Sequence, residues 1–447
     1  MLDFPTVQSW LESHRGRLVG TAEPIAWADS REWRLEEGRM VHRSGGFFSL
    51  SGIAVSAEGA YFDGVQMPII DQPEIGLLGF VVRPREDGTD WLVQAKSEPG
   101  STHWVQVGPS VQATRSNYMR KHQGQATRFL DLFLEGRGEP VGQDHSEQGS
   151  RFLNKYNRNA VVSVTELFDT EAPEWKWTSD DEMRRALGQD FAVNTDARSV
   201  IVTHDWTLLQ KDGPLFAGAS LYDPAFDGLR AHLARSCEPQ ADDPEAVSRA
   251  MERLASRASM RPRVRSVPLD ALPGWSMSPD CLSAPEGTPY GDIEFRMYRV
   301  NAPGREVESW DQPFSVGKVR HRAGLVLALR DGALHVALRL ADEPGFLGKV
   351  QFGPTFQTDA PSHPAIAEMI FETGRRPALS VAQSDEGGRF MSSVVDYEIH
   401  DLTDEAVPDL GADFEWLTMS QLRLLATVPG QMTNEARSAI SVLLSLA

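Results

Sequence analysis

An internal repeat is the feature that most restricts how this chain can fold. Short motifs of the first half return in the same order in the second half. Glu98-Pro99-Gly100 returns as Glu343-Pro344-Gly345, and the segment that begins Gly108-Pro109 returns at Gly353-Pro354. Matching positions lie 238 to 245 residues apart. Because a fixed order at a nearly constant shift marks a duplicated unit, we expect two copies of one fold.

Hydrophobic periodicity and turn residues predict that each copy mixes strands with helices. Asp87-Gly88 and Asp331-Gly332 predict hairpin turns between apolar strands. The patterns predict helices over 5–17, 118–134, 179–187 and 244–260, and strands over 47–55, 75–82, 91–96 and 159–167. We therefore expect the α+β class, with two tandem domains at residues 1–225 and 226–447.

The charge and the cysteine content disfavour several kinds of partner and compartment. The chain has 63 acidic and 44 basic residues, a net charge of −19, which disfavours nucleic acids and anionic membranes. Its two cysteines, Cys237 and Cys281, lack metal-ligand spacing and fit a reduced cytosol. We read no signal peptide and no apolar run of membrane-spanning length. We expect a cytoplasmic protein.

Sequence signatures of the common cofactor sites are missing. We find no dinucleotide-binding Gly-x-Gly-x-x-Gly, no Walker loop, no His-Glu-x-x-His and no Gly-x-Ser-x-Gly. The eleven histidines do not cluster with metal-ligand spacing. We therefore expect a protein that uses neither a metal ion nor an organic cofactor.

Two polar segments are present in the first copy only. Thr114-Arg115-Ser116-Asn117-Tyr118 is replaced in the second copy by Asp359-Ala360-Pro361-Ser362-His363. Asn154-Lys155-Tyr156-Asn157-Arg158 is replaced by Ser392-Ser393-Val394-Val395-Asp396. The retained Arg, Tyr and amide groups favour one working pocket, in the N-terminal copy, with a decayed counterpart. A solvated loop is the alternative interpretation.

Three pairs of large side chains occur in both copies. They are Arg151 with Arg389, Arg198 with Arg437, and Trp177 with Trp416. The planar guanidinium of an arginine could clamp a diphosphate, or it could form a buried structural ion pair. Each tryptophan could stack on a nucleotide base or anchor the core. The sequence leaves these alternatives open.

Several long motifs resemble those of the NDP-hexose 2,3-dehydratases, enzymes of deoxysugar biosynthesis for glycosylated natural products such as antibiotics. They are Gln72-Pro73-Glu74-Ile75-Gly76-Leu77-Leu78-Gly79, Gly108-Pro109-x-Val111-Gln112-Ala113-Thr114-Arg115-Ser116-Asn117-Tyr118 and Ser146-Glu147-Gln148-Gly149-x-Arg151-Phe152, with the closing Trp416-Leu417-Thr418-x-x-Gln421-Leu422. The resemblance implies two Nudix-like domains in a homodimer, with two nucleotide-sugar pockets per subunit of which one is active. Because the metal-binding Nudix helix signature is missing, we do not expect diphosphate hydrolysis.

The resemblance also implies a reaction, the 2,3-dehydration of dTDP-4-keto-6-deoxy-D-glucose. The C4 ketone acidifies the C3 hydrogen, a base removes it, and the C2 hydroxyl leaves. The resulting enol becomes a 2,6-dideoxy-3,4-diketo sugar, which a 3-ketoreductase would take up. The enzyme must supply a base, an acid for the departing hydroxyl and donors to the C4 oxyanion.

We assign candidate residues to these roles by their chemistry. Glu147 is the candidate base, and Tyr118 and Arg115 are candidates for the acid and the oxyanion donor. The candidate substrate-binding residues are Gln112, Thr114, Ser116, Asn117, Ser146, Gln148, Arg151, Arg158, Trp177 and Arg198. The second pocket would hold their counterparts Gln357, Glu386, Arg389, Trp416 and Arg437.

Two other functions are compatible with these residues. One is a non-catalytic nucleotide-sugar-binding partner of a glycosyltransferase, which would bind the substrate without turnover. The other is a ketoisomerase, which shares the deprotonation at C3 but keeps the C2 hydroxyl. Loss of water from the sugar separates the dehydratase from both.

Overall fold

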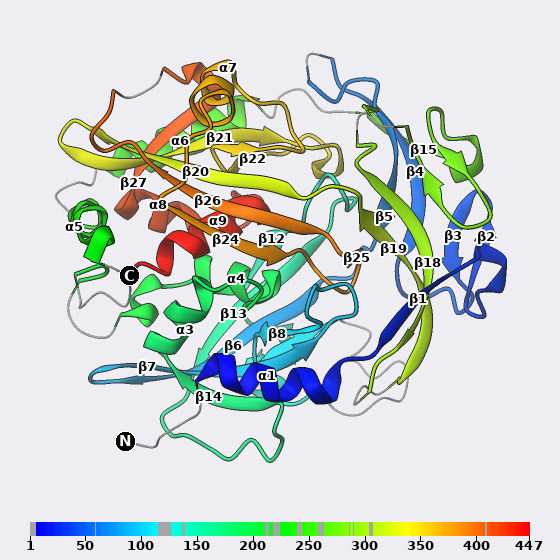
Figure 1. The fold of residues 1–447 in the computed structure, drawn as a ribbon, viewed down its shortest axis with the longest axis horizontal. Helices are drawn as coiled ribbons and strands as arrows, with labels where there is room; N and C mark the ends of the chain where they lie inside the picture. Colours follow the sequence, from blue (N-terminus) through cyan, green and yellow to red (C-terminus); the bar gives the residue numbers. More distant parts are fainter. Residues whose placement is uncertain are drawn as a thin grey trace.

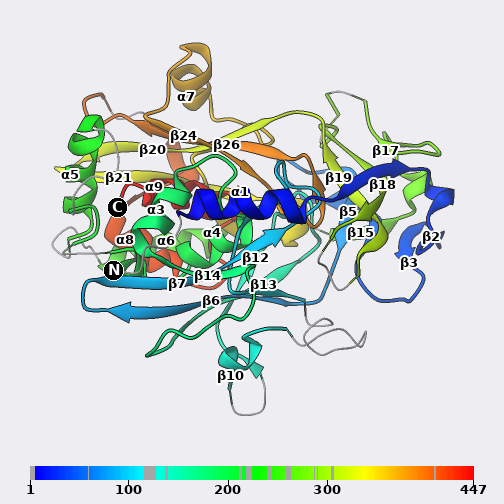
Figure 2. The ribbon, with the colours of Figure 1, turned by 60° about the horizontal axis from the view of Figure 1, so that its bottom comes forward.

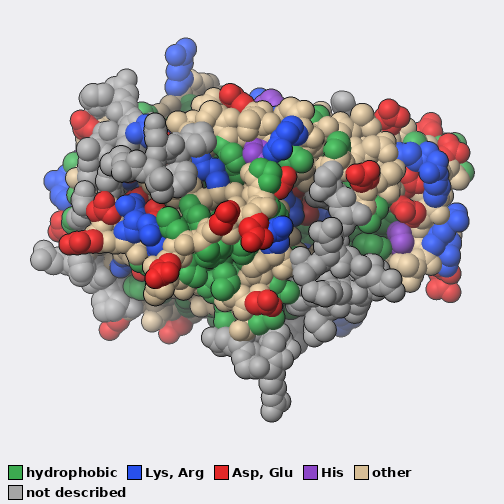
Figure 3. All heavy atoms as spheres, turned by 90° about the horizontal axis from the view of Figure 1, so that it is seen from below, with side chains coloured by type: hydrophobic (Ala, Val, Ile, Leu, Met, Phe, Trp, Pro, Cys, Tyr) green, Lys and Arg blue, Asp and Glu red, His purple; other side chains and the backbone are tan. Residues whose placement is uncertain are grey.

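The computed structural model shows a mixed α+β protein with several sheets and few helices. It describes residues 6–58, 60–114, 127–135, 139–210, 214–217, 224–238, 244–257, 263–285, 287–288, 290–303, 307–406 and 409–447. None of the helices in these ranges is long and apolar enough to cross a membrane. Acidic and basic side chains are interspersed over the face seen in Figure 3, with hydrophobic side chains between them.

The first repeat builds a seven-stranded mixed sheet. Its strands are β6 (Gly76–Arg85), β7 (Gly88–Ser97), β8 (Val105–Gly108), β9 (Val111–Ala113), β12 (Gln143–Ser146), β13 (Tyr156–Ser163) and β14 (Trp175–Ser179). The strand order is β12-β13-β6-β7-β14, with β8 on β7 and β9 on β6, and only β13 and β6 run parallel. Side chains alternate across β7, so Trp91 and Val93 enter the large core while Leu92 enters a smaller one.

The second repeat builds the same sheet again. Its strands are β20 (His321–Arg330), β21 (Ala333–Asp342), β22 (Val350–Gly353), β23 (Phe356–Gln357), β24 (Leu379–Ser384), β26 (Val394–Asp401) and β27 (Phe414–Thr418). The order β22-β21-β20-β26-β24, with β23 on β20 and β27 on β21, matches the first sheet strand for strand. β20 and β26 are again parallel. The fold thus contains the repeat that the motifs predict.

Matching helices lie between these two sheets. The first repeat contributes α1 (Val7–Leu18), α3 (Asp180–Leu187) and α4 (Thr195–Val202), and the second contributes α6 (Pro244–Arg257), α8 (Met419–Ala426) and α9 (Asn434–Leu444). α4 packs against α9 at the centre (Figures 1 and 2), and α5 (Asp227–Ser236) packs on β21. The N-cap side chains of Asn194 and Thr433 hold the first turns of α4 and α9.

Two smaller sheets exchange strands between the repeats. One contains β2 (Trp33–Glu36), β3 (Arg39–His42), β4 (Ser49–Ser56), β5 (Gln66–Asp71) and β15 (Arg263–Val267). The other contains β16 (Ser276–Met277), β17 (Leu282–Ser283), β18 (Ile293–Asn301), β19 (Ser309–Gly317), β25 (Phe390–Met391) and β1 (Thr21–Ile25). In Figure 1 β1 leaves α1 and lies along β18, while β15 lies along β4. Each repeat therefore completes a sheet of the other.

Some predicted elements differ from the observed ones. The predicted strand 159–167 is β13, which begins and ends earlier because its pairing with β6 starts at Asn157. Most of the predicted helix 118–134 lies outside the described residues. Its described end is the 3₁₀ turn η2 (Leu130–Phe133) followed by β10 (Leu134–Glu135), which pairs with β11 (Glu139–Pro140). Phe129 has a left-handed φ of 61°, which prevents a continuous α-helix. In the second repeat α7 (Pro364–Ile366) runs into a π-helical turn, η8 (Ala367–Glu372).

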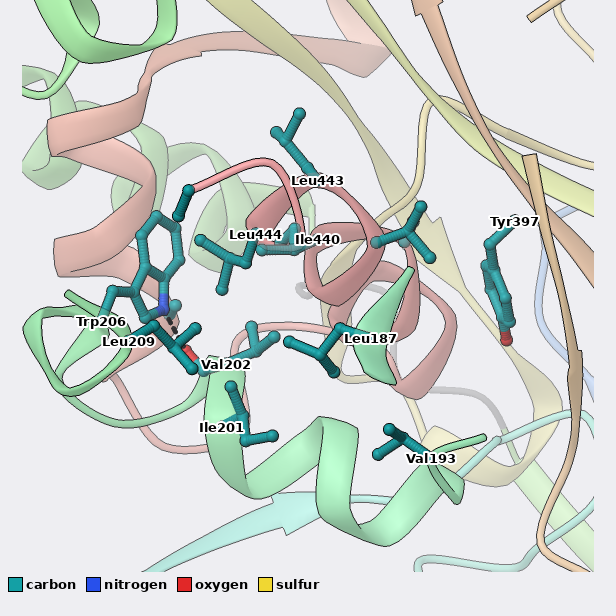
Figure 4. Packing of buried hydrophobic residues seen from close by; sticks show 14 of the residues in the cluster. Leu187, Val193, Ile201, Val202, Trp206, Leu209, Tyr397, Ile440, Leu443 and Leu444 are labelled. Carbon is teal, nitrogen blue, oxygen red and sulfur yellow. Dashed lines mark hydrogen bonds between the residues drawn. The ribbon is translucent and has the colours of Figure 1, made fainter. Parts of the chain in front are cut away.

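The largest hydrophobic core belongs to both repeats. Figure 4 shows Ile201, Val202 and Trp206 of the first repeat facing Ile440 and Leu444 of the second. Trp206 also donates its ring N–H to the Val202 carbonyl at 2.8 Å. The division into 1–225 and 226–447 stays a prediction about the repeats, because neither half encloses this core by itself.

We predict that the shared core makes the halves unfold together. Leu443→Ala should lower the free energy of unfolding by about 2–5 kcal/mol, because Leu443 is fully buried. Denaturant titrations followed by circular dichroism and by tryptophan fluorescence should show one coincident transition. Leu424→Ala is the control, since Leu424 is 48% exposed and its loss should cost less than about 0.5 kcal/mol. Two separate transitions would contradict the shared core.

Candidate functional site

Two glycine turns bring the repeats into contact. The N–H of Gly100 donates to the Gly387 carbonyl at 2.8 Å, and the N–H of Gly345 donates to the Gly149 carbonyl at 2.7 Å. A Cβ on Gly100 would lie 1.7 Å from the Phe390 carbonyl oxygen, so a larger residue cannot fit. Each Glu-Pro-Gly turn therefore packs on the polar loop of the other repeat. This crossing builds two separate clusters of buried charged groups.

Glu147 lies at the centre of the first cluster and is held by both repeats. Its Oε1 accepts a hydrogen bond from Asn157 at 2.8 Å, and its Oε2 accepts one from Asn434 at 2.9 Å. The side chain is only 4% exposed. Burial raises the pKa of Glu147, while Arg437, Lys155 and the two amides oppose that rise. The carboxyl group is thus fixed in place and more basic than an exposed one.

Other groups fix the two amides that hold Glu147. Lys155 donates from Nζ to Oδ1 of Asn157 at 2.7 Å, and the Thr195 hydroxyl donates to Oδ1 of Asn434 at 2.9 Å. With each amide oxygen occupied by a donor, each amide nitrogen faces Glu147. Thr195 and Asn434 occupy equivalent positions of the two repeats, so this hydrogen bond joins the repeats at matching residues.

Three more carboxyl groups surround Glu147. Burial, together with the nearby Glu98 and Glu147, raises the pKa of Glu386 to about 8 against the opposing charge of Arg389. Burial and the neighbouring carboxylates also raise the pKa of Asp196 well above its usual range. Like charges in a poorly solvated site cannot all ionise, so some of these carboxyl groups keep a proton at neutral pH.

The second cluster contains the counterpart residues. Arg151 lies 3.6 Å from Asp292 and 4.0 Å from Asp359, and His321 lies 2.7 Å from Asp292. Burial tends to raise the pKa of Asp292, but His321 and Arg151 lower it to about 2. A small pocket opens here; its lining includes Gln148, Ser150, Arg151, His321, Gln357, Asp359, Asp385 and Glu435.

The structure groups three of the candidate residues differently from the sequence-based assignment. Arg389 and Glu386 of the second repeat join the Glu147 cluster, where Arg389 donates to Gln72 Oε1 at 3.1 Å. Arg151 of the first repeat joins the second cluster. The two loops cross at the glycine turns, so each loop carries its arginine into the other repeat. Sequence position alone groups these residues by repeat, whereas the structure groups them across the crossing.

Two other candidates, Gln112 and Gln148, make hydrogen bonds with residues of the Glu147 cluster. Gln112 donates to Glu98 at 2.7 Å and accepts from Asn194 at 3.0 Å. Gln148 reaches Asn434 Oδ1 at 3.5 Å and also lines the second pocket. Thr114 follows β9 and is half-buried. Arg115, Ser116, Asn117 and Tyr118 lie outside the described residues.

The remaining candidates make structural contacts. Arg198 donates to the Val193 and Ser384 carbonyls at 2.8 and 3.2 Å, and Arg437 donates to the Met432 and Ser146 carbonyls at 2.6 and 2.5 Å. Ser146 donates to Gln351 at 2.7 Å. Arg158 pairs with Asp144 at 2.8 Å. Trp177 packs in a hydrophobic cluster and donates to the Phe168 carbonyl, and Arg330 lies 5.0 Å from the ring of Trp416. Gln357 donates to Asp359 at 3.2 Å.

Sequence reasoning missed several residues of the Glu147 cluster. Asp196 and Asn434 are not among the sequence-based candidates, and Glu98 enters there only as part of the repeated Glu98-Pro99-Gly100 motif. A signal for Asn434 exists, because it precedes the repeated Glu435-Ala436-Arg437-Ser438 motif and differs from its counterpart Thr195. Within the described ranges, no three His, Cys, Asp or Glu side chains converge so as to hold a metal ion.

Comparison with known proteins agrees with the repeat and with the motifs. The family profile described as NDP-hexose 2,3-dehydratase matches residues 5–203 and 247–443. The chain belongs to this family. Relatives named dTDP-4-dehydro-6-deoxy-alpha-D-glucopyranose 2,3-dehydratase include one from Streptomyces violaceoruber, 31% identical over 97% of this chain and 94% of its own length. A second, from Saccharopolyspora spinosa, is 29% identical over 99% of this chain and 92% of its own length. A third, from Amycolatopsis orientalis, is 29% identical over 97% of this chain and 89% of its own length.

Solved structures that match part of this chain include an ADP compounds hydrolase. It aligns with 34% of this chain and 83% of its own, at 15% identity and a TM-score of 0.21. A score of that size carries no argument about the fold. The membership in the dehydratase family therefore rests on sequence alone.

We predict that the paired arginine Arg198 acts as a structural link between the repeats. Arg198→Met keeps the aliphatic volume but removes two charged hydrogen bonds from a fully buried site. The free energy of unfolding should fall by at least about 3 kcal/mol in denaturant titrations. Arg34→Met, at a largely exposed pair with Glu36, should change it by less than about 0.5 kcal/mol. Unchanged stability with a raised KM would instead support the phosphate-clamp alternative.

Proposed function

We propose that this protein removes the C2 hydroxyl of dTDP-4-keto-6-deoxy-D-glucose as a 2,3-dehydratase. Membership in the NDP-hexose 2,3-dehydratase family supports the reaction, and the names of three full-length relatives support the substrate. The product would be a 2,6-dideoxy-3,4-diketo nucleotide sugar for deoxysugar and antibiotic biosynthesis.

The observation that carries the mechanism is the fixed, buried carboxyl group of Glu147. A base that removes the C3 hydrogen must be held within reach and must have a pKa near the working pH. The amides of Asn157 and Asn434 hold both oxygens of Glu147, and burial raises its pKa. A carboxylate has about four lone-pair sites, so two remain for the proton. Glu147 is therefore the base in this proposal.

The remaining roles follow from the reaction. Electrons from the broken C3–H bond delocalise onto the C4 oxygen, and donors placed there stabilise the enolate. Arg115 and Tyr118 stay candidates for these donors. Arg158, Asn117 and Ser116 stay candidates for holding the nucleotide sugar. In this scheme the second cluster is a decayed counterpart that does not turn over substrate.

We also propose the domain type, the assembly and the partner that the resemblance implies. Each repeat would be a Nudix-like domain, and the protein would act as a cytoplasmic homodimer. Its diketone product would pass to a 3-ketoreductase. The mixed sheet with one parallel strand pair in each repeat supports the first of these expectations.

One assay tests the function. The protein is incubated with dTDP-4-keto-6-deoxy-D-glucose and a 3-ketoreductase with its reductant, and the mass of the trapped product is measured by mass spectrometry. A dehydratase gives a trapped sugar that lacks the oxygen of the C2 hydroxyl. A ketoisomerase keeps that oxygen, and a binding protein gives no turnover of its own, so either outcome rejects the proposal.

We predict that Glu147→Gln lowers kcat by about 10²- to 10⁴-fold, because glutamine cannot accept the C3 proton. The melting temperature should stay close to that of the unaltered protein, since glutamine keeps the shape of the side chain. Asp385→Asn, at the equivalent position of the second cluster, should leave kcat within a few-fold. If Asp385→Asn abolishes turnover while Glu147→Gln does not, the working site is the second cluster.

We predict that Asn434 controls the pH dependence of the reaction. Asn434→Leu removes a donor to the ionised form of Glu147, which raises the pKa of that carboxyl group. The acid-side limb of the kcat/KM profile should move upward by about one to two pH units, as expected for a hydrogen bond to a charged group. Asn301→Leu, at an exposed position, is the control. A uniform loss of rate at every pH would contradict the prediction.

A further inference from the structure

The two clusters differ in one respect that bears on proton transfer. Three of the four carboxyl positions of the Glu147 cluster have acidic counterparts in the other repeat: Glu98 with Glu343, Glu147 with Asp385, and Asp196 with Glu435. The fourth does not. Glu386, which joins the Glu147 cluster, corresponds to Gln148, which lines the second pocket.

Glu386 also differs from Glu147 in its contacts. Within the described residues, the Glu386 carboxyl group makes no hydrogen bond or ion pair and remains half-buried, whereas Glu147 has both oxygens held and is 4% exposed. Its backbone is nevertheless fixed. The Glu386 carbonyl accepts from the N–H groups of Arg389 and Phe390 at 3.1 and 2.9 Å, and the adjacent Gly387 carbonyl accepts from Gly100.

We infer that Glu386, supplied by the second repeat, is the general acid that protonates the departing C2 hydroxyl after Glu147 has removed the C3 hydrogen. This inference rests on the proposed function. An amide at the same place, as Gln148 has in the second cluster, can donate a hydrogen bond but cannot transfer a proton. The difference between the two positions therefore also accounts for a single working pocket.

The proton balance closes without a cofactor. Glu147 takes the C3 proton to give the C4 enolate, whose electrons then form the C2–C3 double bond and restore the C4 ketone as the C2–O bond breaks, and the hydroxyl leaves as water with the proton of Glu386. Glu147 is then protonated and Glu386 ionised. Conversion of the enol to the ketone requires loss of the O3 proton and gain of a proton at C2, which returns both groups to their starting states.

The electrostatics of the cluster agree with this role. Burial and the neighbouring Glu98 and Glu147 raise the pKa of Glu386 to about 8, so it keeps its proton at neutral pH. Two carboxyl groups in one site with different surroundings commonly divide into an acid and a base. Asp196 is a weaker candidate for the acid, because its counterpart Glu435 is also acidic, so this position does not distinguish the two clusters.

The test separates the two proton transfers by means of solvent deuterium. Glu386→Gln should lower the rate of water loss by about 10²- to 10⁴-fold. It should keep exchange of the C3 hydrogen for deuterium, seen as a mass increase in recovered dTDP-4-keto-6-deoxy-D-glucose, since Glu147 is intact. Glu147→Gln should lose both. Glu386→Asp should restore part of the elimination, and Glu252→Gln, on the exposed face of α6, should behave as the unaltered protein.

The inference is overturned if Glu386→Gln eliminates water at the unaltered rate, or if it loses exchange and elimination equally. If that variant does not fold, the pH profile of the unaltered protein decides, because elimination should decline as the pH rises through about 8 and Glu386 loses its proton. A rate that stays flat well above that pH rejects Glu386 as the acid. An unaltered protein that releases no water would instead reject the proposed function itself.

Discussion

The close approach of two backbone turns is the constraint on which the rest of this structure depends. Gly100 and Gly345 donate to carbonyls of the opposite repeat at places where a side chain would collide with backbone. The rings of Phe152 and Phe390 meet beside this crossing, with centroids 5.5 Å apart. The crossing fixes which loops face each other. It therefore determines which charged side chains share a cluster, and so where a reaction could take place.

The same crossing accounts for the burial of so many charges. Isolated carboxylates are costly to bury, and here they lie among arginines, lysines and oriented amides that reduce the cost. Arg198 and Arg437 link each repeat to the backbone of the other from fully buried positions. Their contacts also hold the loops that carry Ser384 and Ser146. Stability and the shape of the site thus depend on some of the same groups.

Duplication followed by divergence explains how one half of a symmetric framework can specialise. The backbone arrangement at the two clusters is shared, while individual side chains differ at corresponding positions of the repeat. Asn157 corresponds to Val395, Asn434 to Thr195, and Glu386 to Gln148. Asn157 and Asn434 hold the Glu147 carboxyl group, and Glu386 adds a further acidic group to its cluster. Neither repeat could supply this cluster alone, since its acids and amides come from both.

The sequence by itself determined the α+β class, the repeat, the hairpin turns and the family, because these follow from local patterns and long motifs. It also indicated Glu147 as a candidate, and the retained polar segment that contains Lys155 and Asn157; their roles stay predictions. The sequence grouped Arg151, Glu386 and Arg389 by repeat, whereas in the structure Glu386 and Arg389 join Glu147 and Arg151 lies in the other cluster. Contacts between residues some 140 to 290 positions apart leave no local pattern. Only the tertiary structure, through the crossing of two glycine turns and the exchange of β1 and β15, decided which side chains meet.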